Sequence, residues 1–328
     1  MSSKRNSTRD RSDQLLLIMT MMLLGATLIF GRQFANASNF KALLISFVSI
    51  GFVSVGMMSL LISGVFDLSV GSVFGVGMTM VAYFIADLHF SWPLAAVAAL
   101  GVCALCGAAN GFLVTKMKIN PLIATLGTMG ILRGAAIIIG GVGKAGLPES
   151  FTELGSKPLL LGLAAPVWLF LVTACLFMFM FRHLKFFRKF YFVGGNAEAA
   201  RLCGINGERI LFSGFVIMSL LAGFAGILYC ARLGASTGQA GEGMELRAIA
   251  GVVIGGASIK GGKGTILGGV LGALFMALVF NIIGMSQRIS AYWQPVINGT
   301  ILILAVYTDV IAEQGYFGKI FGKNDKQS

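Results

Sequence analysis

Ten apolar runs fill most of this sequence and leave few folds open to it. A helix that crosses the hydrocarbon core of a bilayer needs about 20 mostly apolar residues, and all but one of the runs approach that length. The runs are longer than barrel strands and do not alternate polar with apolar residues, so only helices satisfy their backbone in lipid. We therefore predict an all-α polytopic membrane protein with about ten transmembrane helices. The predicted segments are 15–31, 42–62, 70–86, 92–114, 121–141, 160–181, 209–231, 248–259, 265–284 and 293–312.

Composition agrees with this class. Hydrophobic residues make up 56% of the 328 residues and charged residues only 12%, unlike a soluble domain. The run at 248–259 is short, about 18 Å as a helix. It must extend into neighbouring residues, tilt little, or form a half-helix buried within the bundle.

The formal net charge of +12 is explained by membrane topology rather than by nucleic-acid binding. With ten segments and an inner N-terminus, most Lys and Arg residues fall in inner stretches, so the positive-inside rule places both termini in the cytoplasm. Trp92, Trp168 and Trp293 then lie near the outer ends of their segments, as expected of an aromatic belt. Lipid is the expected surrounding partner, and no nucleic acid is expected.

This topology divides the chain into a cytoplasmic tail (1–14), a transmembrane domain (15–312) with a cytoplasmic loop (182–208), and a second cytoplasmic tail (313–328). An alternative concerns the first run. Residues 15–30 and the sequence Ala35-Asn36-Ala37 resemble a signal peptide and its cleavage site. Cleavage would leave nine segments, whereas an uncleaved anchor retains ten.

Two halves of the sequence share local patterns. Leu100-Gly101 and Asn110 recur as Leu271-Gly272 and Asn281, and Asp67-Leu68 before the third segment recurs as Glu245-Leu246 before the eighth. Segments five places apart run in opposite directions, so the pattern indicates inverted internal repeats, which are typical of transporters.

Polar groups in the interior are candidates for a substrate pathway; the hydroxyls and amides among them can hydrogen-bond a hydroxylated solute without adding charge. Interhelical hydrogen bonding and helix capping are the competing explanations. The candidates are Asp67, Ser69, Asn110, Asn120, Thr125, Thr128 and Asn281.

A polar mini-helix is expected within the 182–208 loop. Asn196 is a good N-cap, Glu198 places a negative charge in the first turn, and Gly204 is suited to a left-handed stop. Ala199, Leu202 and Cys203 share one face. The segment is either a docking helix for a partner or ordinary surface structure.

Motifs for catalysis, metal and nucleotide are weak or missing. The stretch Lys260-Gly261-Gly262-Lys263-Gly264-Thr265 lacks the Walker A pattern, and two histidines assemble no metal cluster. No arrangement of serine, histidine and acid suggests a nucleophilic enzyme.

Four ordered motifs resemble the membrane subunits of bacterial ABC importers for monosaccharides, the ribose, arabinose, xylose and galactose permease family. The Val65-Phe66 pair before Asp67 departs from the Gly-Ile of many members and favours a pentose weakly. The motifs are Ser63-Gly64-Val65-Phe66-Asp67-Leu68-Ser69-Val70-Gly71, Lys118-Ile119-Asn120-Pro121-Leu122-Ile123-Ala124-Thr125-Leu126-Gly127-Thr128-Met129, Val193-Gly194-Gly195-Asn196-Ala197-Glu198-Ala199-Ala200-Arg201 and Ile249-Ala250-Gly251-Val252-Val253-Ile254-Gly255-Gly256-Ala257-Ser258.

The resemblance implies a permease of the bacterial inner membrane with no cofactor of its own. ATP and Mg would be bound by a separate ATPase chain. The other partners would be a second permease subunit, as homodimer or heterodimer, and a periplasmic sugar-binding protein. The family's coupling helix would correspond to Gly195, Asn196, Ala197, Glu198, Ala199, Ala200, Arg201, Leu202 and Gly204.

Two other classes stay open. One is a self-sufficient secondary transporter of a small polar solute, which has no need of a cytoplasmic docking helix. The other is a membrane scaffold or enzyme without transport activity. The preferred prediction is a monosaccharide permease subunit.

Overall fold

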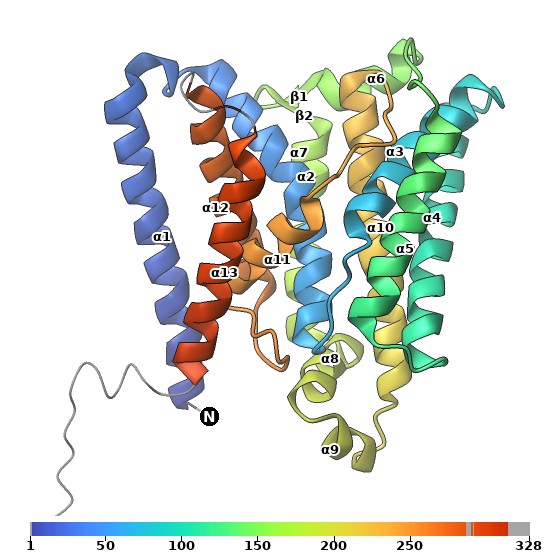
Figure 1. Ribbon diagram of the computed structural model, residues 1–328. Helices are drawn as coiled ribbons and strands as arrows, with labels where there is room; N and C mark the ends of the chain where they lie inside the picture. The colour runs from blue at the N-terminus through green and yellow to red at the C-terminus, as the bar shows by residue number, and fades with distance from the viewer. Residues whose placement is uncertain (1, 287–289, 291, 314–328) are drawn as a thin grey trace, which may run out of the picture.

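The computed structural model describes residues 2–286, 290 and 292–313, and most of them are helical (Figure 1). The elements in chain order are α1 (Ser2–Phe30), η1 (Gly31–Gln33), α2 (Ala37–Ile62), α3 (Val70–Ala86), α4 (Trp92–Thr115), α5 (Pro121–Gly140), α6 (Glu149–Ser156), β1 (Pro158–Leu160), β2 (Leu163–Ala164), α7 (Ala165–His183), α8 (Lys185–Gly195), α9 (Ala197–Leu202), α10 (Gly207–Leu233), α11 (Met244–Ile254), α12 (Ile266–Met285) and α13 (Trp293–Glu313).

Seven helices in the described part of the chain are long and apolar enough to cross a membrane. They are α2, α4, α5, α7, α10, α12 and the stretch Leu15–Gln33, most of which belongs to α1. Helix α3 is also apolar but has 17 residues. The fold is therefore a helical membrane bundle, as predicted, but the described residues show seven such helices rather than the predicted ten or so.

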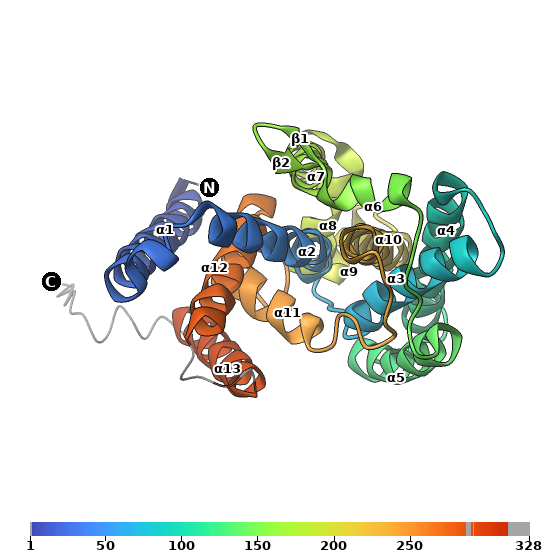
Figure 2. The same ribbon diagram turned by 90° about the horizontal axis from the view of Figure 1, so that it is seen from above.

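Helices α2 and α10 form the centre of this bundle (Figure 2). Within its apolar window α2 is 89% buried, compared with 17% for α5, which lies at the periphery. Helix α10 packs against α4, α3 and α2, while α12 packs against α2 and α11. Glycine makes the α3–α10 contact close, because a Cβ on Gly77 would lie 2.5 Å from the Gly223 carbonyl oxygen. Small residues are expected where helices cross in a membrane, because they let the two backbones approach closely.

Two helices begin inside the bundle rather than at its ends. The irregular segment 63–69 rises from the α8 end of the molecule to α3, and the segment 234–243 descends from the opposite end to α11 (Figure 1). Helix α11 has 11 residues, about 16 Å, too short to cross a bilayer. Of the three alternatives for this region, the structure therefore has the buried half-helix, at 244–254 rather than 248–259. Irregular backbone is tolerated at this depth because protein surrounds it.

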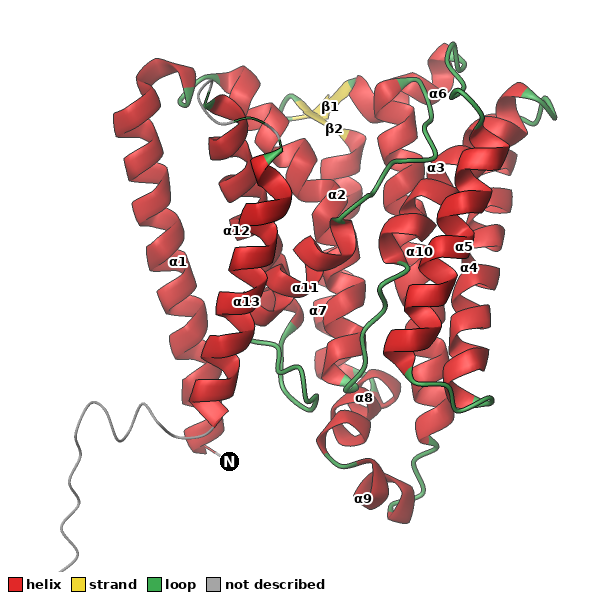
Figure 3. Ribbon diagram, viewed as in Figure 1, coloured by secondary structure: helices red, strands yellow, loops and turns green. Residues whose placement is uncertain are grey.

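Two helix boundaries differ here from the sequence predictions. Helix α7 begins at Ala165 rather than 160, because residues 158–164 form a small hairpin, so the fold is not strictly all-α (Figure 3). Leu161 and Gly162 both have positive φ, as a type I′ turn requires. Helix α1 begins at Ser2, so it includes most of the predicted tail 1–14. The predicted tail 313–328 lies, apart from Glu313, outside the described residues.

Candidate functional site

Helices α8 and α9 project from one end of the bundle (Figure 1). The Asn196 side chain accepts a 2.9 Å hydrogen bond from the amide of Ala199, and Gly204 has φ +75°. The mini-helix is therefore capped and stopped by the residues expected from the sequence. Glu198 and Arg201 form an exposed 2.7 Å ion pair on its surface.

One side of α9 is packed and the other is open. Ala200 is buried against the body of the protein, whereas Ala199, Leu202 and Cys203 are exposed. The Leu202 side chain is 80% exposed, which is high for a residue of this size. The apolar face predicted from the sequence is thus presented outward.

Aromatic packing anchors α8 to α7. Phe187 and Phe190 are buried, with Phe181 of α7 at centroid distances of 5.2 and 5.6 Å. Lys185, Arg188 and Lys189 point away from this cluster and are exposed. Aromatic contacts of this kind add about 0.5–1.5 kcal/mol each beyond the burial of apolar area, so α8 and α7 are expected to move together.

Three segments meet at a point that we call the glycine junction, formed by Gly64, Gly194, Gly261 and Gly262. A Cβ on Gly194 would lie 2.0 Å from the carbonyl oxygen of Ile62, and one on Gly261 would lie 2.7 Å from the Gly64 Cα. Gly64, Gly261 and Gly262 also have positive φ, where glycine is favoured. The junction joins the end of α8 to segment 63–69 and to segment 255–265, which connects α11 to α12.

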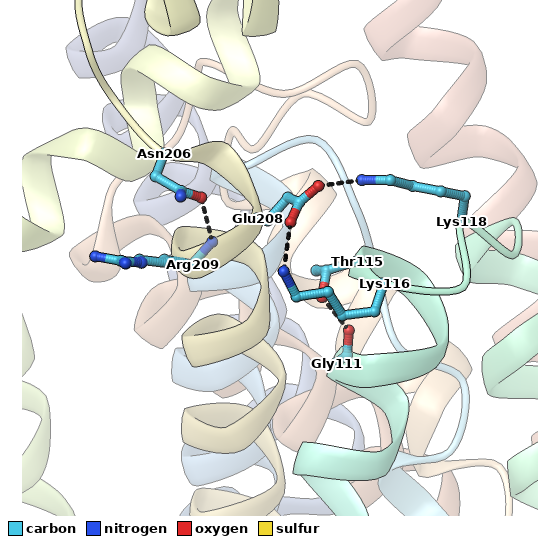
Figure 4. A network of polar contacts seen from close by, with 7 residues as sticks. All are labelled: Gly111, Thr115, Lys116, Lys118, Asn206, Glu208 and Arg209. Carbon is cyan, nitrogen blue, oxygen red and sulfur yellow. Dashed lines mark hydrogen bonds and ion pairs between the residues drawn. The ribbon is translucent and has the colours of Figure 1, made fainter.

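A second contact ties the start of α10 to the turn between α4 and α5 (Figure 4). Glu208 accepts hydrogen bonds from Lys118 and, at 3.0 Å, from Lys116. Asn206 caps α10 by accepting a 3.0 Å hydrogen bond from the amide of Arg209. These exposed pairs contribute little stability, but they link the chain leaving α9 to a neighbouring turn.

Three of the predicted pathway residues form one buried polar cluster. Asp67 Oδ1 accepts hydrogen bonds from the Ser69 amide and hydroxyl at 2.7 and 2.6 Å. The Asn110 amide nitrogen donates to Ser69 Oγ at 2.8 Å and lies 3.4 Å from Asp67 Oδ2. All three side chains are fully buried. The cluster attaches segment 63–69 to α4.

Three others bond within α5. Asn120 caps the helix by accepting from the Leu122 amide at 2.9 Å, and Thr125 donates to the Pro121 carbonyl at 2.8 Å. Thr128 donates to the Thr125 carbonyl at 3.2 Å. These contacts agree with the capping and packing explanation; a pathway role for the three residues stays a prediction.

A cavity of about 390 Å³ lies toward the end of the bundle opposite α8 and α9. Its wall combines aromatic rings with hydroxyl, amide and charged groups and comes from α2, α3, α10, α11, α12 and segment 234–243. The lining residues are Ser46, Ser49, Ile50, Phe74, Tyr229, Arg232, Leu233, Thr237, Gln239, Ala240, Gly241, Glu242, Met244, Arg247, Ala277 and Phe280.

A neighbouring cavity of about 370 Å³ shares Ser46, Arg247 and Phe280 with the first. The guanidinium carbon of Arg247 lies 4.2 Å from the centre of the Phe280 ring, and Arg247 donates to Gln294 at 3.2 Å. Asn281 also lines this second cavity and exchanges hydrogen bonds with Asn39 at 2.8 and 3.2 Å. Of the predicted pathway residues, Asn281 is thus placed beside a cavity.

Sequence reasoning missed most of this wall. Arg247, Tyr229, Gln239 and Phe280 are not among the residues that the sequence predicts for a site. One available signal was the short run at 248–259, because interrupted segments often mark a transporter's binding site. Arg247 lies directly before that run.

Comparison with known proteins gives consistent results. Residues 39–306 match the family described as "Branched-chain amino acid transport system / permease component". The autoinducer 2 import system permease protein LsrC of Escherichia coli (strain K12 / DH10B) is 33% identical over 92% of this chain and 87% of the relative. The LsrC protein of Salmonella typhi is 31% identical over 90% of this chain and 84% of the relative. No solved structure matches the chain.

Proposed function

Because this chain belongs to the branched-chain amino acid transport system permease component family, we propose that it is the membrane-spanning subunit of an ATP-driven importer for a monosaccharide, a pentose or a hexose. As a family member it is a transport component and a multi-pass protein of the bacterial inner membrane. The observation that carries the proposed cargo is the composition of the 390 Å³ cavity.

That cavity offers the two kinds of surface that a monosaccharide needs. Tyr229 and Phe280 supply aromatic rings, while Thr237 and Gln239 supply hydroxyl and amide groups. A pocket with apolar walls and a few polar groups that fix orientation is the usual form of a small-molecule site. The similarity to permeases named for autoinducer 2 import also supports a small polar cargo.

The proposal includes the partners and the symmetry of the bundle. The ATPase chain would dock at α9, a periplasmic binding protein would deliver cargo at the opposite end, and a second permease subunit would complete the transporter. Both termini would be cytoplasmic. The opposite entry of segments 63–69 and 234–243 (Figure 1) supports inverted repeats that pair α3 with α11.

Coupling would run through the glycine junction. Movement of α8 and α9 on ATP binding would displace Gly194, which packs against Ile62 at the end of α2. The same movement would reach α12 through Gly264, whose carbonyl accepts a 3.0 Å hydrogen bond from Tyr191 of α8. Packed elements have discrete arrangements, so such a displacement would switch the bundle between two openings.

Reconstitution tests the proposal. The chain is placed in proteoliposomes with the ATPase and binding-protein partners, and uptake of labelled pentoses and hexoses is followed. We expect uptake that requires ATP and the binding protein and that unlabelled leucine does not inhibit. Uptake driven by an ion gradient without ATP would instead establish the secondary transporter, and inhibition by leucine would overturn the proposed cargo.

A further inference from the structure

Arg133 is a charged residue in the middle of α5, at membrane depth. Its Nη1 atom donates hydrogen bonds to the carbonyl oxygens of Gly238 and Ala240, at 2.9 and 2.6 Å. The side chain is half-buried. Charged groups are costly in a membrane and usually mark function. The proposed transport mechanism gives this one no role.

The two carbonyls belong to segment 234–243, which we call the cavity loop. Thr237, Gln239 and Glu242 of this loop line the 390 Å³ cavity. Gly238 lies on the side of the loop that faces α5, where a Cβ added to it would be 2.6 Å from the Ile137 Cα. The loop therefore lies between the cavity and α5, with Gly238 packed against α5 and Thr237 and Gln239 on either side of it lining the cavity.

Glycine on α3 allows this close approach. A Cβ on Gly75 would lie 2.9 Å from the Ala240 carbonyl oxygen and 3.1 Å from Arg133 Nη1. The beginning of the loop is held separately, because the Ser236 amide donates to the Lys144 carbonyl at 2.8 Å. Arg133 is thus the side chain that fastens the middle of the loop.

We propose that Arg133 is a positioning residue for the cargo cavity, holding the cavity loop against α5 so that Thr237 and Gln239 face the cargo. Without it, two carbonyls at membrane depth lose their donor, and an unsatisfied buried acceptor costs about 1–3 kcal/mol. The loop would then leave α5 to find other donors. The cavity would widen and bind cargo less tightly.

One nitrogen makes both hydrogen bonds, and this gives the proposal a sharp test. The ammonium group of Arg133→Lys can still donate to both carbonyls, whereas Arg133→Met keeps a long apolar stem without a donor. Gly75→Ala disturbs the same contact with Arg133 in place, and Gly134→Ala is a matched control because a Cβ there meets nothing within 4 Å.

The first measurement needs no cargo. Thr237→Cys is introduced with the exposed Cys175 and Cys203 changed to serine, and the complex with its ATPase is placed in nanodiscs and labelled with a polar maleimide. We expect the thiol at position 237 to be labelled at least about tenfold faster in the Arg133→Met and Gly75→Ala variants than in the parent. The reason is that each variant loses about one charged hydrogen bond between Arg133 and the loop. Arg133→Lys and Gly134→Ala should stay within about threefold of the parent. Equal labelling rates in all variants would overturn the proposal.

The second measurement rests on the proposed function. In the complete importer, Arg133→Met should raise the apparent KM for cargo about tenfold with little change in maximal rate, and Arg133→Lys should restore it. Equal KM values for the Met and Lys variants would contradict positioning by Arg133. If the parent chain carries no sugar but the labelling rates differ as expected, the proposed cargo fails while the role of Arg133 stands.

Discussion

The amide of Gly262 donates a 2.8 Å hydrogen bond to the carbonyl oxygen of Ile62, the last residue of α2. This bond fastens the most buried span of the bundle to the segment before α12. Gly194 of α8 packs over the same carbonyl. Three parts of the molecule therefore meet at the Ile62 carbonyl oxygen: α2, to which it belongs, the segment before α12, and α8, which belongs to the proposed coupling element.

Gly194→Ala should uncouple ATP hydrolysis from transport. Its Cβ would lie 2.0 Å from the Ile62 oxygen, so α8 must shift away, at a cost of about 1–3 kcal/mol for overpacking. We expect uptake to fall at least tenfold while ATPase activity of the assembled complex persists. Gly207→Ala is the matched control, because a Cβ at this nearby glycine comes no closer than 3.7 Å to Val193 and lies outside the proposed coupling helix. Equal uptake by the two variants would refute transmission through the junction.

Glu198→Lys and Leu202→Asp should weaken docking of the ATPase without unfolding the permease. Both side chains are exposed, and the Glu198–Arg201 pair contributes at most about 1 kcal/mol. We expect insertion and thermal stability close to the parent, with a loss of uptake and of co-purified ATPase. The double variant Glu198→Lys with Arg201→Glu restores the ion pair in reverse. Recovery of uptake in this double variant would show that the pair, and not the surface, is what matters.

Asn110→Leu should destabilise the protein. It removes the donor to Ser69 and Asp67 and leaves a buried carboxyl group with fewer partners, which costs about 1–3 kcal/mol. Thermal unfolding in detergent measures this, with Thr125→Val as control because Thr125 bonds its own helix. Parent-like stability together with lost uptake would instead make Asn110 a pathway residue.

Asn281→Leu should raise the apparent KM for cargo. Asn281 lines a cavity that shares Arg247 and Phe280 with the larger one. The substitution makes the wall less polar and removes the hydrogen bonds between Asn281 and Asn39, which keeps its bond to the Phe34 carbonyl. Asn206→Ala offers the contrast, because losing that cap of α10 costs about 1 kcal/mol of stability and should leave KM unchanged. The same KM for parent and Asn281→Leu would assign Asn281 to helix packing.

Much of the fold was predictable from local sequence because its causes are local. Run length and apolar character predicted the spanning helices, since lipid offers the backbone no alternative partner. The cap at Asn196 and the stop at Gly204 were likewise visible, because a cap bonds atoms only a few residues away. The hairpin at 158–164 was missed because its Leu161-Gly162 turn places a leucine at positive φ, which is uncommon.

The candidate site depends on contacts between distant segments. Asp67 and Asn110 were both predicted pathway residues. They lie 43 positions apart, so the sequence around either residue does not predict their contact. Arg133 and Arg247 were not predicted as site residues, because the cavity loop and the Phe280 ring come beside them only in the folded bundle. The sequence by itself determined a helical membrane protein with a capped polar mini-helix, because the length of an apolar run and a helix cap are both set by residues close together in the chain. Only the tertiary structure decided which residues form the cavity wall and the glycine junction. The segments that form them are far apart in the sequence, and only the packing of the helices brings them together.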